Sequence, residues 1–151
     1  MNKREYYPYE PFIQKAVLEH LAKNNYSTGE SRELWEHDVD IKMRNSSYSR
    51  YWLIEVKGGS NSENKRSVET NNFVFGLGQI VTRIQSATNP QAKTGSNKYG
   101  VAYPYYFIKY LKNKRLHWNL CKNLNLYIFL VNEVGEVEEY NWKRIKDEFY
   151  K

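Results

Sequence analysis

Two acidic residues and a lysine near the middle of the chain have types and spacing suited to hydrolytic chemistry. Glu55 and Lys57 are two residues apart in YWLIEVKGG (51–59), so on a β-strand they point to the same face. Asp40 lies in the preceding segment WEHDVDIKM (35–43), where apolar and polar residues alternate as in a half-buried strand. If the two segments pair as an antiparallel hairpin, Asp40 lies opposite Glu55, with Lys57 next along the strand.

Two carboxylates on neighbouring strands repel each other unless a proton or a cation lies between them. Mg²⁺ (or Mn²⁺) suits such a pair, because it takes one or two carboxylates together with water and phosphate oxygens. An ion on Asp40 and Glu55 would lower the pKa of a bound water and neutralise phosphate oxygens. The ammonium of Lys57 would stabilise the hydroxide or the charge that develops on the phosphate. The set predicts hydrolysis of a phosphodiester.

The choice of aspartate depends on the register of the hairpin. Asp38 shares the predicted face of Asp40, and a shift of the pairing would exchange their roles. We favour Asp40 because it pairs naturally with Glu55. Aspartate is otherwise scarce in this chain, since only three of the 17 acidic residues are Asp, and the third is Asp147.

The next segment, FGLGQIVTRI (75–84), adds two polar side chains at helical spacing. Gln79 and Arg83 are four residues apart, so they share one helical face, away from the apolar stripe formed by Leu77, Ile80, Val81 and Ile84. A glutamine can orient a water or a phosphate, and an arginine can bind a phosphate through two nitrogens. Spacing alone slightly favours a solvated helix face instead.

The pattern Asp40 … Glu55-Val56-Lys57, between a helix headed by an acidic residue and a helix carrying Gln79, resembles the PD-(D/E)xK, restriction-endonuclease-like nucleases. The resemblance covers about residues 10–103. It implies an αβββαβ core, a magnesium-dependent endonuclease, and DNA as the substrate.

The same resemblance implies individual roles. Asp40 and Glu55 would be the metal ligands, Lys57 the catalytic lysine, and Gln79 the glutamine that many members carry on this helix. A glutamate on the first helix would be Glu10, with Glu19 as the alternative. The sequence departs from the family pattern in having no proline before the aspartate, a position where the family often lacks it.

The elements that must position these residues follow from periodicity and turn signals. We expect a single domain, 1–151, of the mixed α/β class, with a central mixed sheet flanked by helices, a nuclease-like core at about 10–103 and a C-terminal extension at 104–151. The expected elements are a helix at 10–24, strands at 28–34 (the weakest), 35–43 and 51–57, a polar loop at 58–72, a helix at 72–88, a strand at 98–104, a helical segment at 105–124, a strand at 124–133, and a short strand or helix after Gly135.

Charge and composition narrow the class of partner. Lys and Arg number 23 against 17 acidic residues, a net charge of +6, which favours an anionic partner such as nucleic acid. No apolar run is long enough to cross a bilayer and the N-terminus has no apolar signal region, so we expect a cytoplasmic protein without a membrane partner. A single cysteine, Cys121, excludes an internal disulfide.

Three groups of basic residues are candidates for contact with nucleic acid. Lys65 and Arg66 lie in the predicted loop beside the strand that carries Glu55, and Arg83 lies on the following helix. The segment KYLKNKR (109–115) either follows a phosphate backbone or forms a solvated helix face. A homodimer would suit cleavage of both strands, although no interface is legible in the sequence. The alternatives to a nuclease are a non-cleaving nucleic-acid-binding module on the same fold and a basic structural protein.

Overall fold

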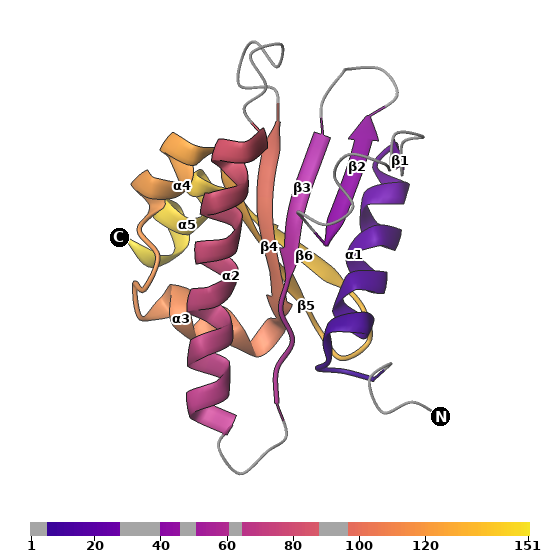
Figure 1. The fold of residues 1–151 in the computed structure, drawn as a ribbon. Coiled ribbons are helices and arrows are strands. Elements are labelled where there is room, and N and C mark those ends of the chain that lie inside the picture. Colours follow the sequence, from indigo (N-terminus) through magenta and orange to yellow (C-terminus); the bar gives the residue numbers. More distant parts are fainter. Residues whose placement is uncertain (1–5, 28–39, 46–50, 61–64, 88–96) are drawn as a thin grey trace.

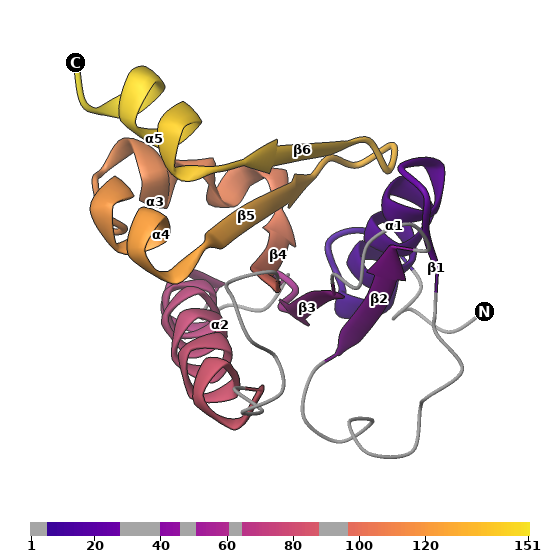
Figure 2. The same ribbon diagram turned by 90° about the horizontal axis from the view of Figure 1, so that it is seen from above.

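The computed structural model describes residues 6–27, 40–45, 51–60, 65–87 and 97–151. In these residues one six-stranded sheet runs in the order β1-β2-β3-β4-β5-β6, with helices on both faces (Figures 1 and 2). The elements are α1 (Glu10–Lys23), β1 (Tyr26–Ser27), β2 (Ile41–Asn45), β3 (Tyr51–Val56), α2 (Lys65–Ala87), β4 (Lys98–Pro104), a 3₁₀ turn (Tyr105–Phe107), α3 (Ile108–Lys112), α4 (Trp118–Leu124), β5 (Leu126–Val131), β6 (Val137–Tyr140) and α5 (Trp142–Phe149).

The sheet is mixed, as predicted. Strands β1, β2 and β3 pair antiparallel, β3, β4 and β5 pair parallel, and β6 returns antiparallel to β5. Each parallel pair needs a crossover, which α2 supplies between β3 and β4, and α3 with α4 between β4 and β5. The mixed α/β class with helices flanking the sheet is confirmed, and the first six elements of the described residues follow the order α, β, β, β, α, β.

The alternation of β3 divides its side chains between two apolar cores. Trp52, Ile54 and Val56 pack with α1 on one face, whereas Leu53 packs with α2 and the C-terminal helices on the other. Because β3 and β4 are covered on both faces, their sequences read as nearly continuous apolar runs. Glu55 shares the parity of Leu53, and at 4% exposure it is a rare charged residue in that run.

The start of α2 corrects one expectation. Residues 58–72 were expected to form a loop, but the helix begins at Lys65. Its first two turns are polar, yet several of their side chains have specific partners. The carboxylate of Glu69 accepts a hydrogen bond from the hydroxyl of Tyr106, and the amide of Asn72 donates to the carbonyl of Gly58 at 2.8 Å. Hydrophobic periodicity does not register a helix that is anchored by such polar contacts.

Other boundaries also differ from expectation. The segment 105–124 is a 3₁₀ turn and two short helices rather than one helix, because the chain reverses at Lys114, whose φ is 58°, and His117 then caps α4 by accepting from the N–H of Asn119 at 3.1 Å. Strand β2 ends at Asn45 rather than at residue 43. The expected strand at 28–34 and residues 35–39 lie outside the described residues. No helix in the described ranges is long and apolar enough to span a bilayer.

Candidate active site

The start of β2 and the end of β3 bring Asp40 and Glu55 together. Ile41 pairs with Ile54, so continuing the register by one residue places Asp40 opposite Glu55. Asp40 lies directly before β2 rather than inside a strand, and its carboxylate accepts a hydrogen bond from the N–H of Val56 at 2.7 Å. This bond ties the aspartate to the end of β3. Asp38, the alternative to Asp40, lies outside the described residues.

Glu55 is a buried carboxylate with an altered affinity for protons. Burial, then the hydrogen bond and the negative charge of Asp40, raise the pKa of Glu55 from 4.5 to about 7. The guanidinium of Arg83 opposes this shift, with its Nε 3.4 Å from a Glu55 oxygen. The glutamate therefore keeps its proton to a higher pH than an exposed carboxyl does, and a cation could take the place of that proton.

Glu10 lies within electrostatic reach of both Lys57 and Asp40. Glu10 is the first residue of α1, and partial desolvation raises the pKa of its carboxyl. The positive charge of Lys57 and a hydrogen bond from the backbone of Gly58 lower that pKa, while the negative charge of Asp40 raises it. These mutual effects join the start of α1 to the start of β2 and the end of β3. Glu19, the alternative to Glu10, lies more than two turns further along α1.

The approach of α1 to β3 requires a residue without a side chain. A Cβ on Gly58 would lie 2.8 Å from the backbone nitrogen of Glu10 and 2.9 Å from the carbonyl oxygen of Pro8. The N–H of Gly59 also donates to the Pro8 carbonyl at 2.8 Å. Gly58 thus allows the first turn of α1 to pack directly on the end of β3.

Gln79 and Arg83 lie on the face of α2 that is turned toward β3. Gly76, on the same helical face, is so close to the sheet that a Cβ there would lie 3.1 Å from the Lys57 side chain. The side-chain oxygen of Gln79 is buried and has no hydrogen-bond partner within the described part of the chain. Gln79 and Arg83 therefore do not form a solvated helix face. The residue in the sequence that indicates this is Gly76, because its lack of a side chain allows α2 to approach the sheet closely.

The described residues contain no group of three or more His, Cys, Asp or Glu side chains able to hold a metal ion. The donors that are present are the carboxylates of Asp40 and Glu55 and the unpartnered oxygen of Gln79. A hard cation with few protein ligands suits this set, because Mg²⁺ retains several waters and needs only one or two carboxylates. The chemistry of the donors thus fits Mg²⁺, with Glu10 beyond the immediate ligands.

Lys65 and Arg66 do not join this site. They lie exposed on the first turn of α2 and line a cavity of about 1120 Å³ whose lining includes neither Asp40 nor Glu55. Glu69, which is 1% exposed, was not among the residues predicted from the sequence. Helical spacing could have indicated it, because positions 69, 73, 76 and 80, which are buried in the described part of α2, lie on one face of the helix. The first of these positions is a glutamate, so the face does not read as apolar over its first turn.

Comparison with known proteins identifies no relative, since no protein-family model, curated protein or solved structure was found to match this chain. The functional interpretation therefore depends on the geometry of the site. Two close carboxylates, one of them with a raised pKa, lie beside the guanidinium of Arg83, and the ammonium of Lys57 acts on the neighbouring carboxyl of Glu10. Such a set can bind a divalent cation and an anionic oxygen together.

Proposed function

We propose that this protein is a metal-dependent nuclease that hydrolyses phosphodiester bonds, with DNA as the favoured substrate. The observation that carries the proposal is that Asp40 lies opposite Glu55 across β2 and β3, while Lys57 follows Glu55 by two residues with its side chain against α2. The element order α, β, β, β, α, β around them is the order that the resemblance to PD-(D/E)xK nucleases implies. The net charge of +6 favours an anionic substrate.

In this proposal Asp40 and Glu55 hold Mg²⁺, which when bound supplies an acidic water and neutralises charge on the phosphate. Glu55 binds the ion in its ionised form, and Arg83 beside it favours that form. The ammonium of Lys57 donates hydrogen bonds to oxygens that gain negative charge as the phosphodiester is attacked. Gln79 presents its unpaired oxygen to a water, which it can orient.

The test is nicking of supercoiled plasmid with Mg²⁺ or with EDTA. The variants Asp40→Asn, Glu55→Gln and Lys57→Ala should each lower the nicking rate by about 10²-fold or more, the loss typical of removing one group that stabilises transition-state charge. Glu19→Gln is the matched control and should keep the wild-type rate, because Glu19 is exposed on α1 and distant from these residues. Full nicking activity in all three site variants would overturn the proposal.

The alternative is a nucleic-acid-binding module that does not cleave. It is favoured by the partners that the two carboxylates already have, since Arg83 lies beside Glu55 and the N–H of Val56 donates to Asp40. The plasmid assay separates the two functions when DNA binding is measured in parallel. Binding without Mg²⁺-dependent nicking supports the alternative, and nicking that EDTA abolishes supports the nuclease.

A further inference from the structure

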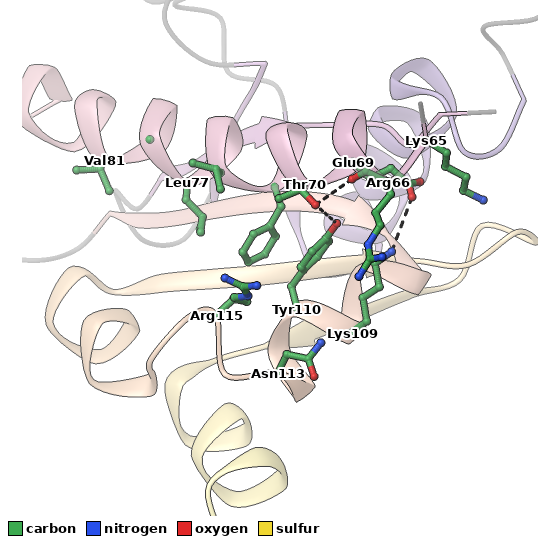
Figure 3. Close-up of a pocket in the computed structure, with 13 residues that line it drawn as sticks. Lys65, Arg66, Glu69, Thr70, Leu77, Val81, Lys109, Tyr110, Asn113 and Arg115 are labelled. Carbon is green, nitrogen blue, oxygen red and sulfur yellow. Dashed lines mark hydrogen bonds and ion pairs between the residues drawn. The ribbon is translucent and has the colours of Figure 1, made fainter. Parts of the chain in front are cut away.

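The cavity of about 1120 Å³ lies between α2 and the segment that follows β4 (Figure 3). We call it the α2–α3 groove. Its lining residues come from α2 and from residues 109–115: Lys65, Arg66, Glu69, Thr70, Phe73, Val74, Leu77, Gly78, Val81, Lys109, Tyr110, Asn113 and Arg115. Two basic segments that are far apart in the sequence, Lys65-Arg66 and 109–115, thus form opposite walls of one groove.

The groove is strongly cationic. Four basic side chains line it against a single carboxylate, Glu69. Glu69 is already engaged, because Tyr106 donates to it and the ammonium of Lys109 lies 3.8 Å away. Within the described residues the guanidinium groups of Arg66 and Arg115 have neither an ion pair nor a hydrogen bond, and both side chains are exposed. Both guanidinium groups can therefore bind an anion that enters the groove.

The wall formed by α2 is apolar. Val74 is 60% exposed and Val81 is 42% exposed, with Leu77 half-buried between them. A Cβ on Gly78 would meet nothing within 4 Å, so the space beside this wall is open. Opposite α2, the ring of Tyr110 stacks on Phe73 with centroids 4.5 Å apart and closes the floor. Exposed apolar side chains under a cationic rim suit a ligand with flat apolar faces and a polyanionic backbone.

We propose that the α2–α3 groove binds single-stranded nucleic acid, with phosphates on Arg66 and Arg115 and bases against Val74, Leu77 and Val81. A duplex fits these observations less well, because its base faces are stacked inside the helix and leave the apolar wall without a partner. The choice of a nucleic acid among polyanions rests on the proposed nuclease function. To that function we add the surface on which the nucleic acid binds and its single-stranded form.

The experiment measures binding of fluorescently labelled oligo(dT) and oligo(U) of about 15 nucleotides, and of a duplex of equal length, by anisotropy in EDTA. For single strands, the logarithm of the binding constant falls with the logarithm of the salt concentration by about 0.7 per phosphate contact. The double variant Arg66→Ala/Arg115→Ala loses two such contacts, so this slope should fall by about 1.4 and binding at about 0.1 M salt should weaken about 25-fold. Val81→Glu should also weaken binding. The matched control Lys15→Ala/Lys23→Ala removes the same charge from exposed positions on α1 and should bind as wild type.

The outcomes separate this inference from the proposed function. Weaker single-strand binding in the groove variants and not in the α1 control supports the groove, even if no variant cleaves DNA. Equal losses in both double variants indicate a general charge effect and overturn it. Groove variants that weaken only duplex binding also overturn it, even if Mg²⁺-dependent nicking is found. The ratio of oligo(dT) to oligo(U) affinity then assigns DNA or RNA to the groove.

Discussion

Replacement of Glu55 by glutamine should make the protein more stable at alkaline pH while removing the proposed activity. Glutamine has nearly the shape of a protonated glutamate, but it does not ionise. The native Glu55 carboxyl has a pKa of about 7 against an ordinary 4.5, because burial and the neighbouring Asp40 disfavour its charge. The ionised glutamate is therefore a destabilising feature of the native site, and the glutamine variant lacks it.

The direction and size of the effect follow from proton linkage. Between pH 4.5 and about 7 the native glutamate holds a proton that the unfolded chain has released. Wild-type stability therefore falls as pH rises through this window, and the full loss is present above it. At 1.36 kcal/mol per pH unit, the window corresponds to about 3 kcal/mol. The side chain is only 4% exposed, so solvent screening reduces this value little.

The measurement is urea unfolding of the wild type and Glu55→Gln, in EDTA, from about pH 4 to about pH 8. The difference in unfolding free energy between the two proteins should increase by about 3 kcal/mol in favour of glutamine across that range, and titrating groups that do not interact with Glu55 cancel. In thermal melts the same change corresponds to about 6–12 °C for a chain of this size. Asp40→Asn should reduce the pH dependence without removing it, because burial remains. A difference that stays constant with pH would refute the buried carboxylate pair.

Two further predictions concern residues that position the site and the groove. Gly58→Ala should lower the unfolding free energy by about 1–3 kcal/mol, because its new Cβ would lie within 2.9 Å of backbone atoms at the start of α1, whereas Gly78→Ala, with nothing within 4 Å, should raise it by about 0.5–1 kcal/mol. Urea unfolding compares the two, and equal effects would contradict the close approach. Tyr106→Phe should cost about 1–3 kcal/mol, since it removes the hydroxyl that donates to buried Glu69, while exposed Tyr105→Phe should change stability by less than about 0.5 kcal/mol. If the two tyrosine variants melt alike, Glu69 does not depend on that donor.

The parts of the site that could be predicted from the sequence are those fixed by a local period. Alternation along β3 puts Glu55 and Lys57 on the face opposite Trp52 and Ile54, and the structure has Trp52 and Ile54 packed with α1. The facing of Asp40 follows from the same period two. The face on which a residue lies can be predicted without knowing the exact residue at which the strand begins. Asp40 therefore lies opposite Glu55 although β2 begins one residue later, at Ile41.

The ionisation of the site could not be predicted in the same way. Glutamate has the same sequence letter whether its pKa is ordinary or raised, and the difference comes from burial and from distances to groups that are remote in the chain. Arg83 lies 28 residues after Glu55, and Asp40 lies 15 residues before it. Gly76 brings the helix close enough for Arg83 to contact Glu55. Spacing within the helix alone carried no information about that distance.

The groove escaped prediction because α2 was expected to start two turns too late. With residues 65–72 treated as a loop, Lys65 and Arg66 appeared to belong to the carboxylate site. In the helix they lie instead above the residues that follow β4, and the cationic segment 109–115 gains a facing partner. A search for apolar residues at helical spacing does not detect the first turns of α2, because the buried position there is Glu69.

Helix α2 therefore separates the α2–α3 groove from the carboxylate site, although Lys65 and Arg66 were predicted to lie beside the strand that carries Glu55. At about 100° per residue, Val74 in the groove and Arg83 beside Glu55 lie about 180° apart around α2. The groove and the carboxylates therefore lie on opposite sides of α2. Substitutions in the groove should thus alter capture of a strand without changing the ionisation of Glu55, and substitutions at Asp40 should do the reverse. This separation allows the proposed binding and the proposed cleavage to be tested independently.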